Sequence, residues 1–186
     1  MIEIRWHGRG GQGAVTAAAL LAKAVINEGR YAQAIPSFGS ERRGSPVLAF
    51  NRIDDEPILI RSEIYEPDVV VVLDPYLPFS INVAEGLKDG GTAIVNSKRP
   101  ISEFVEYFKN AGKIAVVDAT KIAVEELKVP ITNTAILGAI MRATGLAKLE
   151  SIEDVVKERF RGEIAERNLR AVRRAYQETN VVEVKR

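Results

Sequence analysis

The segment from residue 2 to residue 35 places the strongest constraint on how this chain folds. Residues 2–6 alternate apolar and polar side chains, which predicts a strand. A glycine-rich turn at residues 8–13 follows, and the alanine-rich apolar run at 14–26 predicts a helix that ends before Gly29. Residues 31–35 predict a second strand. This order of strand, glycine turn, helix and strand indicates a right-handed crossover in an α/β domain.

Three later segments predict further strands of a buried sheet. Residues 68–74 form an unbroken apolar run between two aspartates, and 92–95 and 113–117 are similar. Such runs indicate strands that are covered on both faces, as in a parallel sheet between helices. Residues 46–52 and 58–61 flank a polar turn and predict a hairpin, so we expect a mixed sheet.

Helical patterns separate these strands and continue after them. Helices are predicted at 78–87, 102–110 and 119–127, the last capped by Asp118. From residue 133 the pattern is helical throughout, with a capping-box spacing at Ser151. The last predicted helix covers 163–178, followed by no further predicted element. We therefore expect one Rossmann-like three-layer α/β domain over residues 1–186, with a mixed, mostly parallel sheet and a helical C-terminal end.

Composition excludes several kinds of site. The 186 residues contain no cysteine and a single histidine, so this chain cannot build thiolate clusters or a multi-histidine metal site. The 26 basic and 25 acidic residues leave a formal charge of +1, which argues against nucleic acid as a partner. No apolar run is long enough for a membrane helix, and the N-terminus lacks the order of a signal peptide. We expect a cytoplasmic protein that binds no membrane.

The glycine turn matches the G-x-G-x-x-G fingerprint in its proper context, after a strand and before a helix. The unpaired amides of a helix N-terminus suit an anion such as pyrophosphate. A dinucleotide-binding domain, however, normally has an acidic residue at the end of the second strand, and residues 34–37 contain none. Three interpretations remain open: dinucleotide binding, capture of another anion, and a turn whose glycines serve tight bending and close packing.

Two segments together are more specific than either alone. Residues 7–13 read His-Gly-Arg-Gly-Gly-Gln-Gly, and residues 37–44 read Ser-Phe-Gly-Ser-Glu-Arg-Arg-Gly. This pair resembles the gamma subunits of 2-oxoacid:ferredoxin oxidoreductases, and the pyruvate-specific members are the most similar. Residues 133–138 also resemble a helix start of that family, and the similarity covers about residues 2–146. Ser45 departs from the pattern, because a second glycine stands there in the family.

The resemblance implies a subunit of a larger enzyme. Such enzymes decarboxylate a 2-oxoacid oxidatively, transfer the acyl group to coenzyme A and reduce ferredoxin. Thiamine diphosphate, magnesium and iron–sulfur clusters are then expected on partner subunits, with no cofactor, metal or catalytic residue in this chain. The chain would complete the hetero-oligomer, cover the active site or meet coenzyme A, and be inactive by itself. The alternative is an independent nucleotide-binding domain.

The candidate contact residues lie in the two loops. A guanidinium group binds phosphate with paired hydrogen bonds, but it also forms ion pairs or remains solvated. The candidates for an anion or partner contact are Gly8, Arg9, Gly10, Gly11, Gln12 and Gly13, and those for coenzyme A are Arg42 and Arg43.

Three other residues have a functional and a structural interpretation. His7 is expected to be a hydrogen-bonded structural residue rather than a base. Asp74 and Asp118 follow strands, as a carboxylate pair or, more simply, as caps. In the last helix, Glu163 and Glu166 stand four residues before Arg167 and Arg170, which predicts two ion pairs and weakens an RNA-binding interpretation.

Overall fold

A computed structural model describes residues 1–37 and 44–184, and one seven-stranded sheet runs through them. The strands are β1 (Ile2–Arg9), β2 (Tyr31–Pro36), β3 (Pro46–Asp54), β4 (Val69–Val72), β5 (Gly91–Asn96), β6 (Ala111–Val117) and β7 (Asn180–Glu183), in the order β2-β3-β1-β4-β5-β6-β7. Strands β1, β4, β5 and β6 are parallel, whereas β3 is antiparallel to β1 and β2, and β7 to β6. The predicted mixed, mostly parallel sheet is confirmed.

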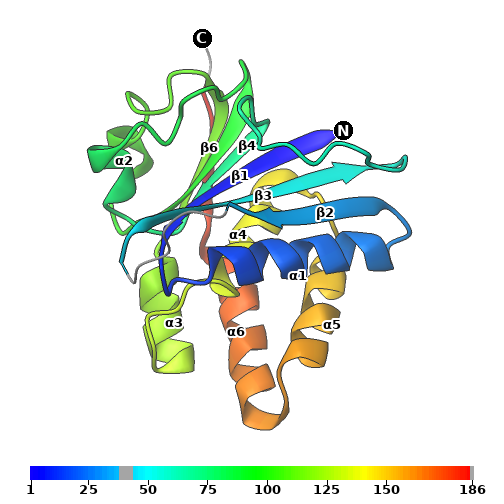
Figure 1. Cartoon of the computed structure of the whole chain (residues 1–186). Coiled ribbons are helices and arrows are strands. Elements are labelled where there is room, and N and C mark those ends of the chain that lie inside the picture. The colour runs from blue at the N-terminus through cyan, green and yellow to red at the C-terminus, as the bar shows by residue number, and fades with distance from the viewer. Residues whose placement is uncertain (38–43, 185–186) are drawn as a thin grey trace.

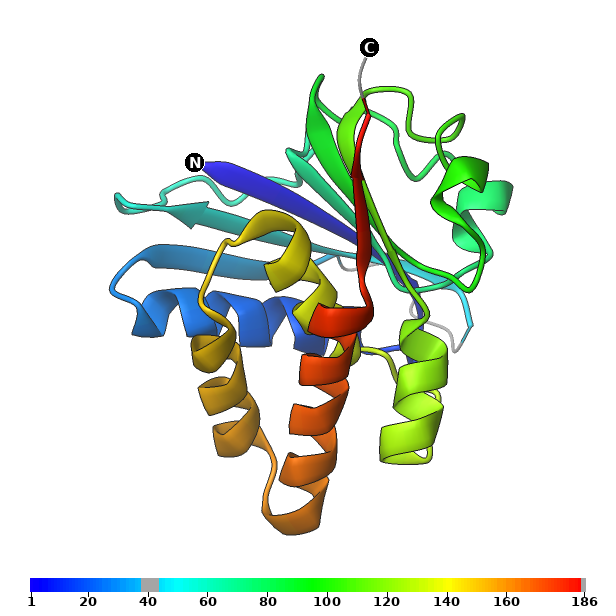
Figure 2. The ribbon, with the colours of Figure 1, turned by 180° about the vertical axis from the view of Figure 1, so that it is seen from behind.

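Helices cover the two faces of the sheet unequally (Figures 1 and 2). One face carries α1 (Ala14–Asn27), α3 (Ala119–Leu127), α4 (Ala135–Thr144), α5 (Leu149–Arg159) and α6 (Gly162–Glu178). The other face carries the short α2 (Leu77–Ser80), the 3-10 turn η1 (Ile101–Glu103) and long stretches of coil. These make the three layers of the predicted α/β fold, with a hydrophobic core on each side of the sheet.

Glycine sets the distance between α4 and α6. A Cβ added to Gly138 would lie 2.1 Å from the carbonyl oxygen of Val172 and 2.9 Å from the amide nitrogen of Tyr176. Both atoms belong to the backbone of α6, so no side-chain movement would relieve the contact. The close approach lets the two helices pack almost backbone to backbone.

The predicted hairpin is wrong. Residues 58–61 form no strand, and β3 pairs instead with β1 on one side and β2 on the other. Leu59 is 87% exposed, which shows that this apolar segment crosses the surface rather than joining the sheet. The insertion of β3 also means that β1 and β2 are not neighbours, although α1 connects them.

Other local predictions differ from the structure at their boundaries. The helices predicted at 78–87 and 102–110 are only the four residues of α2 and the three of η1, and turns complete both segments. Helix α5 begins at Leu149, so Ser151 lies inside it and caps nothing. Strand β7 was not predicted, because four residues near a chain end carry little pattern. Of the helices in residues 1–37 and 44–184, none is long and apolar enough to cross a bilayer.

Candidate functional site

The carboxyl ends of the parallel strands meet at one edge of the sheet, which is where α/β folds commonly bind ligands. The glycine loop, residues 8–13, follows from β1 at this edge. Asp74 lies just after β4, Asn96 ends β5 and Asp118 follows β6. The topology therefore gathers the predicted loop and both predicted aspartates at one edge, as expected from their positions after strands.

The glycine loop is closed by its own hydrogen bonds. The amide of Arg9 donates to Oε1 of Gln12 at 2.7 Å, and the amide of Gln12 donates to the carbonyl of Arg9 at 3.0 Å. The amide of Gly10 donates to the carbonyl of Ser45 at 2.9 Å, and the amide of Gly44 donates to the carbonyl of Gly10 at 3.3 Å. Amides that would face an anion are thus partly engaged within the protein.

Asp74 holds the loop from the other side. Its Oδ2 accepts from Nε2 of Gln12 at 2.8 Å and lies 3.3 Å from Nε of Arg9. Its Oδ1 accepts from the amide of Tyr76 at 3.0 Å, and the residue is only 6% exposed. The carboxylate engages Arg9, the cation of the loop that would bind a pyrophosphate, and so offsets the positive charge there. This negative charge, together with β3 between β1 and β2, counts against the dinucleotide interpretation.

The geometry favours the interpretation in which the glycines allow a tight turn and close packing of the backbone. Gly11 and Gly13 have φ values of 95° and 84°, which residues with a Cβ rarely adopt. A Cβ on Gly13 would also lie 2.9 Å from the Cβ of Asn133. Asn133 precedes α4, so the tight turn brings the start of α1 against the start of α4.

A pocket of about 500 Å³ opens at the same edge, beyond β4, β5 and β6. Its cations are Lys98, Arg99 and Lys121, and its carboxylate is Asp118. Asp118 accepts from the amide of Lys121 at 2.9 Å, which confirms the predicted cap. It makes no pair with Asp74, whose side chain bonds to the glycine loop and to the amide of Tyr76. The remaining lining residues are Pro75, Tyr76, Asn96, Ser97 and Thr120.

Hydrogen bonds connect the pocket to the glycine loop. Asn96 Nδ2 donates to the carbonyl of Leu73 at 2.7 Å and to Oγ1 of Thr120 at 2.8 Å, so the ends of β4, β5 and β6 are tied together. Asp74 then joins Tyr76, at the pocket wall, to Gln12 in the loop. Arg99 is held by Glu103 at 2.7 Å and lies 5.0 Å above the ring of Phe79.

His7 is a structural residue. It is 5% exposed, and its Nε2 accepts from Nε of Arg5 at 3.0 Å. Burial, and then the charge of Arg5, lower the pKa of His7 to about 3. Arg5 also donates to the carbonyls of Tyr65, Val83 and Glu85, and so fastens the coil over this face of the sheet. A histidine with this pKa is neutral at physiological pH and a poor base, as the sequence led us to expect.

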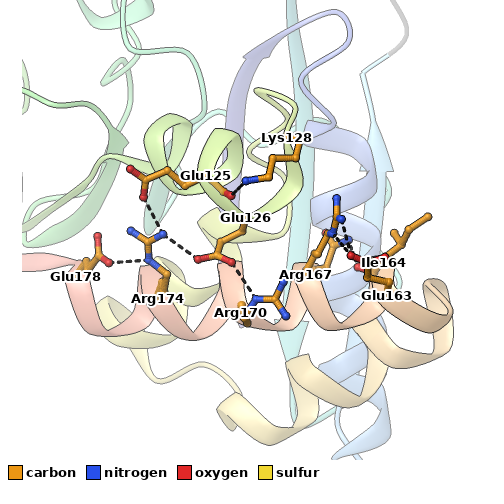
Figure 3. Close-up of polar contacts among 10 residues, drawn as sticks. Glu125, Glu126, Lys128, Glu163, Ile164, Arg167, Arg170, Arg174 and Glu178 are labelled. Atoms are coloured by element: carbon orange, nitrogen blue, oxygen red, sulfur yellow. Dashed lines mark hydrogen bonds and ion pairs between the residues drawn. The ribbon is translucent and has the colours of Figure 1, made fainter.

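Two arginines of α6, Arg170 and Arg174, bind α3 rather than facing a nucleic acid (Figure 3). Glu126 of α3 accepts from Arg170 and Arg174, each at 2.9 Å. Glu163 accepts from Arg167 at 3.1 Å, which confirms one predicted ion pair. The predicted pair of Glu166 with Arg170 is wrong, because Arg170 reaches across to Glu126 instead.

Arg42 and Arg43 lie outside the described residues. Arg43 directly precedes Gly44 in the chain, and Gly44 bonds to the glycine loop through its amide and through its carbonyl, which accepts from Arg9 at 3.2 Å. The end of the predicted arginine segment therefore adjoins the glycine loop.

The pocket cations were not predicted from the sequence. Lys98 and Arg99 follow β5, and Lys121 lies in the first turn of α3. The available signal was their position just after buried strands, where parallel strands bring separate segments together.

The chain is similar over nearly its whole length to known proteins. Residues 3–178 match the family model of pyruvate ferredoxin/flavodoxin oxidoreductase. The pyruvate/ketoisovalerate oxidoreductases common subunit gamma of Pyrococcus furiosus is 59% identical over 99% of this chain and 100% of the relative. The crystal structure of pyruvate oxidoreductase subunit PORC from Thermotoga maritima superposes with a TM-score of 0.87 at 44% identity, covering 98% of each chain.

A more distant structure supports the fold alone. The gamma subunit of a keto/oxoacid ferredoxin oxidoreductase from Geobacter sulfurreducens gives a TM-score of 0.73 at 23% identity, over 96% of this chain and 98% of the other. The family match extends from β1 through α6, and so includes the glycine loop, the pocket and the paired helices. The chain belongs to the pyruvate ferredoxin/flavodoxin oxidoreductase family.

Proposed function

We propose that this chain, the gamma subunit of a multi-subunit 2-oxoacid:ferredoxin oxidoreductase, shapes the part of the complex that coenzyme A reaches. The match of residues 3–178 to the family, with relatives named as gamma subunits over their full length, carries this assignment. The complex oxidises a 2-oxoacid such as pyruvate, forms the acyl-coenzyme A and reduces ferredoxin. The closed glycine loop beside Asp74 gives no support to an independent nucleotide-binding domain.

The redox and carbon chemistry belongs to partner subunits in this proposal. An iron–sulfur cluster needs thiolate ligands, and the chain has no cysteine to supply them. Thiamine diphosphate with magnesium and the iron–sulfur clusters are therefore assigned to the other subunits, which also meet ferredoxin. The gathering of all seven described strands in one sheet supports a single domain, and we place the complex in the cytoplasm.

We assign Arg42 and Arg43 to the phosphates of coenzyme A. Guanidinium groups bind phosphate with paired hydrogen bonds, and Arg43 leads directly into Gly44, which the glycine loop holds. Lys98, Arg99 and Lys121 add positive charge around the pocket at the same edge. The six residues from Gly8 to Gly13 act in this scheme mainly by fixing where the arginine segment ends.

Assembly is tested first. The tagged chain is purified without oxygen from the organism that encodes it, and its mass is measured under native conditions. We expect a stoichiometric complex with larger subunits that contain iron, whereas a free chain carrying its own nucleotide would contradict the assignment.

The coenzyme A contact is tested in the assembled complex. Replacing both Arg42 and Arg43 by Gln should raise the KM for coenzyme A roughly tenfold or more, since two charge-assisted contacts are lost. The KM for the 2-oxoacid should stay unchanged. Arg61→Gln is the control, because Arg61 is an exposed arginine outside both loops. An unchanged KM for coenzyme A in an intact complex would remove these arginines from the site.

A further inference from the structure

Strand β2 forms one outer edge of the sheet, and its free backbone groups can be assigned from the pairing with β3. The amide of Ser37 donates to the carbonyl of Leu48, and hydrogen-bonded positions alternate along an antiparallel pair. Tyr31, Gln33 and Ile35 therefore bond to β3. The amide and carbonyl groups of Ala32 and Ala34 point away from the sheet, and within the described residues they have no hydrogen-bond partner.

This edge lacks a charged side chain, which is one of the usual protections against another strand, and its proline, Pro36, stands at the end of the strand. Exposed edges commonly carry a charged side chain that discourages pairing. The six residues of β2, Tyr-Ala-Gln-Ala-Ile-Pro, include no charge, whereas the opposite edge strand β7 ends in Glu183. Ala32 and Ala34 have small side chains, so a second strand can approach closely.

Apolar side chains border the same edge. Tyr31 is 46% exposed, and Leu59 is 87% exposed in the segment that crosses beside β2. Nε2 of Gln33 donates to the carbonyl of Ile58 at 2.9 Å, which places that segment next to the centre of the strand. Contact with another molecule would remove this apolar surface from water.

We propose that β2 pairs antiparallel with β2 of a second copy of this chain, around a two-fold axis at Gln33. Ala32 then faces Ala34 of the second copy, and Ala34 faces its Ala32. Each of these two pairs exchanges two hydrogen bonds, so four backbone bonds join the copies.

The ends of the strand fit this register. The next pair outward would match Arg30 with Pro36 of the second copy. Pro36 has no amide hydrogen, and the amide of Arg30 already donates to Val25. The ladder therefore stops where the free donors stop. On the face of the strand away from the side chains of Ala32 and Ala34, Tyr31 lies opposite Ile35 of the second copy. An aromatic residue opposite a β-branched one stabilises a sheet. The proposal is independent of the coenzyme A assignment.

The first test is sedimentation equilibrium of the purified full chain. We expect a concentration-dependent dimer that Ala34→Pro weakens roughly tenfold to a hundredfold, because one amide donor per copy is lost. The control is Glu183→Pro, which removes an outward amide from the opposite edge strand β7. It should leave the dimer intact. Thermal melting confirms that each variant is folded.

The second test checks the register with charge. Tyr31→Lys with Ile35→Lys places like charges opposite each other across the axis and should abolish the dimer. Tyr31→Lys with Ile35→Glu loses the same apolar groups but places opposite charges together, and should retain it. A wild-type chain that stays monomeric at all concentrations overturns the proposal. Equal behaviour of the two double variants also overturns it. If the wild-type chain is a monomer and Ala34→Pro fails to join the heteromeric complex, the edge binds another subunit and the proposal is again overturned.

Discussion

Replacement of Gly138 by Ala should destabilise the protein, although alanine favours helices. Gly138 lies inside α4, where exchanging glycine for alanine normally stabilises a helix by about 1 kcal/mol. Here the new methyl group would lie 2.1 Å from the carbonyl oxygen of Val172. Because that oxygen belongs to the backbone of α6, the two helices must separate. Overpacking of this kind costs about 1–3 kcal/mol, and a backbone obstacle places it at the upper end.

The net loss in the free energy of unfolding should therefore be about 2 kcal/mol. For a protein of this size that lowers the melting temperature by about 4–8 °C. Urea unfolding can be followed by the fluorescence of Trp6, which is the only tryptophan and is fully buried. The denaturant dependence of the free energy should stay unchanged, since the surface exposed on unfolding is the same.

A matched control makes the reverse exchange. Ala19→Gly makes the opposite exchange at an exposed position of α1, and should destabilise by about 1 kcal/mol through helix propensity alone. Both variants should thus be less stable than the wild type. An equal or higher stability of Gly138→Ala would refute the close helix contact, because propensity would then be the only effect present.

Two further predictions concern charged groups. Burial lowers the pKa of His7 to about 3 in the folded protein, so the unfolded chain binds the extra proton between about pH 6.5 and that value. Stability from this residue should be complete above about pH 6.5 and fall by up to about 1.4 kcal/mol per pH unit toward pH 3. When urea unfolding is measured at several pH values, the free energy of unfolding should change less with pH in His7→Gln than in the wild type. An equal pH dependence in both proteins would contradict the burial of a neutral imidazole. Hydrogen bonds from Arg174 and Arg170 lower the pKa of Glu126. Glu126→Gln removes the charge that holds these two arginines and should lower the free energy of unfolding by about 0.5–1 kcal/mol, and by less at high salt. Glu166 of α6 forms no ion pair within the described residues, although its charge attracts Arg173, and Glu166→Gln should change the free energy of unfolding by less than about 0.5 kcal/mol. An equal effect of both variants would show that the bonds of Glu126 to Arg170 and Arg174 in Figure 3 contribute nothing.

The sequence identified the elements whose pattern is local. The glycine turn after a strand, the four-valine run of β4 and the Asp118 cap depend on neighbouring residues, and each lies where it was predicted. The family resemblance was also carried by two short segments, and the comparisons bear it out. The absence of cysteine leaves this chain without the thiolate ligands that iron–sulfur clusters use.

The pairing of distant segments depends on the order of the strands in the folded protein. Residues 46–61 were predicted as a hairpin, because strands that follow each other in the chain usually lie side by side. In the structure, β3 lies between β1 and β2 instead. Asp74 was predicted to act as a cap or, less simply, as half of a carboxylate pair, and its Oδ1 does accept from the amide of Tyr76. Its bonds to Arg9 and Gln12 were not predicted, because they depend on the parallel arrangement of β1 and β4. Arg170 forms its ion pair with Glu126 across the α3–α6 contact and not with Glu166 in its own helix. In each case the deciding interaction joins residues far apart in the chain, and the order of the strands and the packing of the helices determine which of them meet.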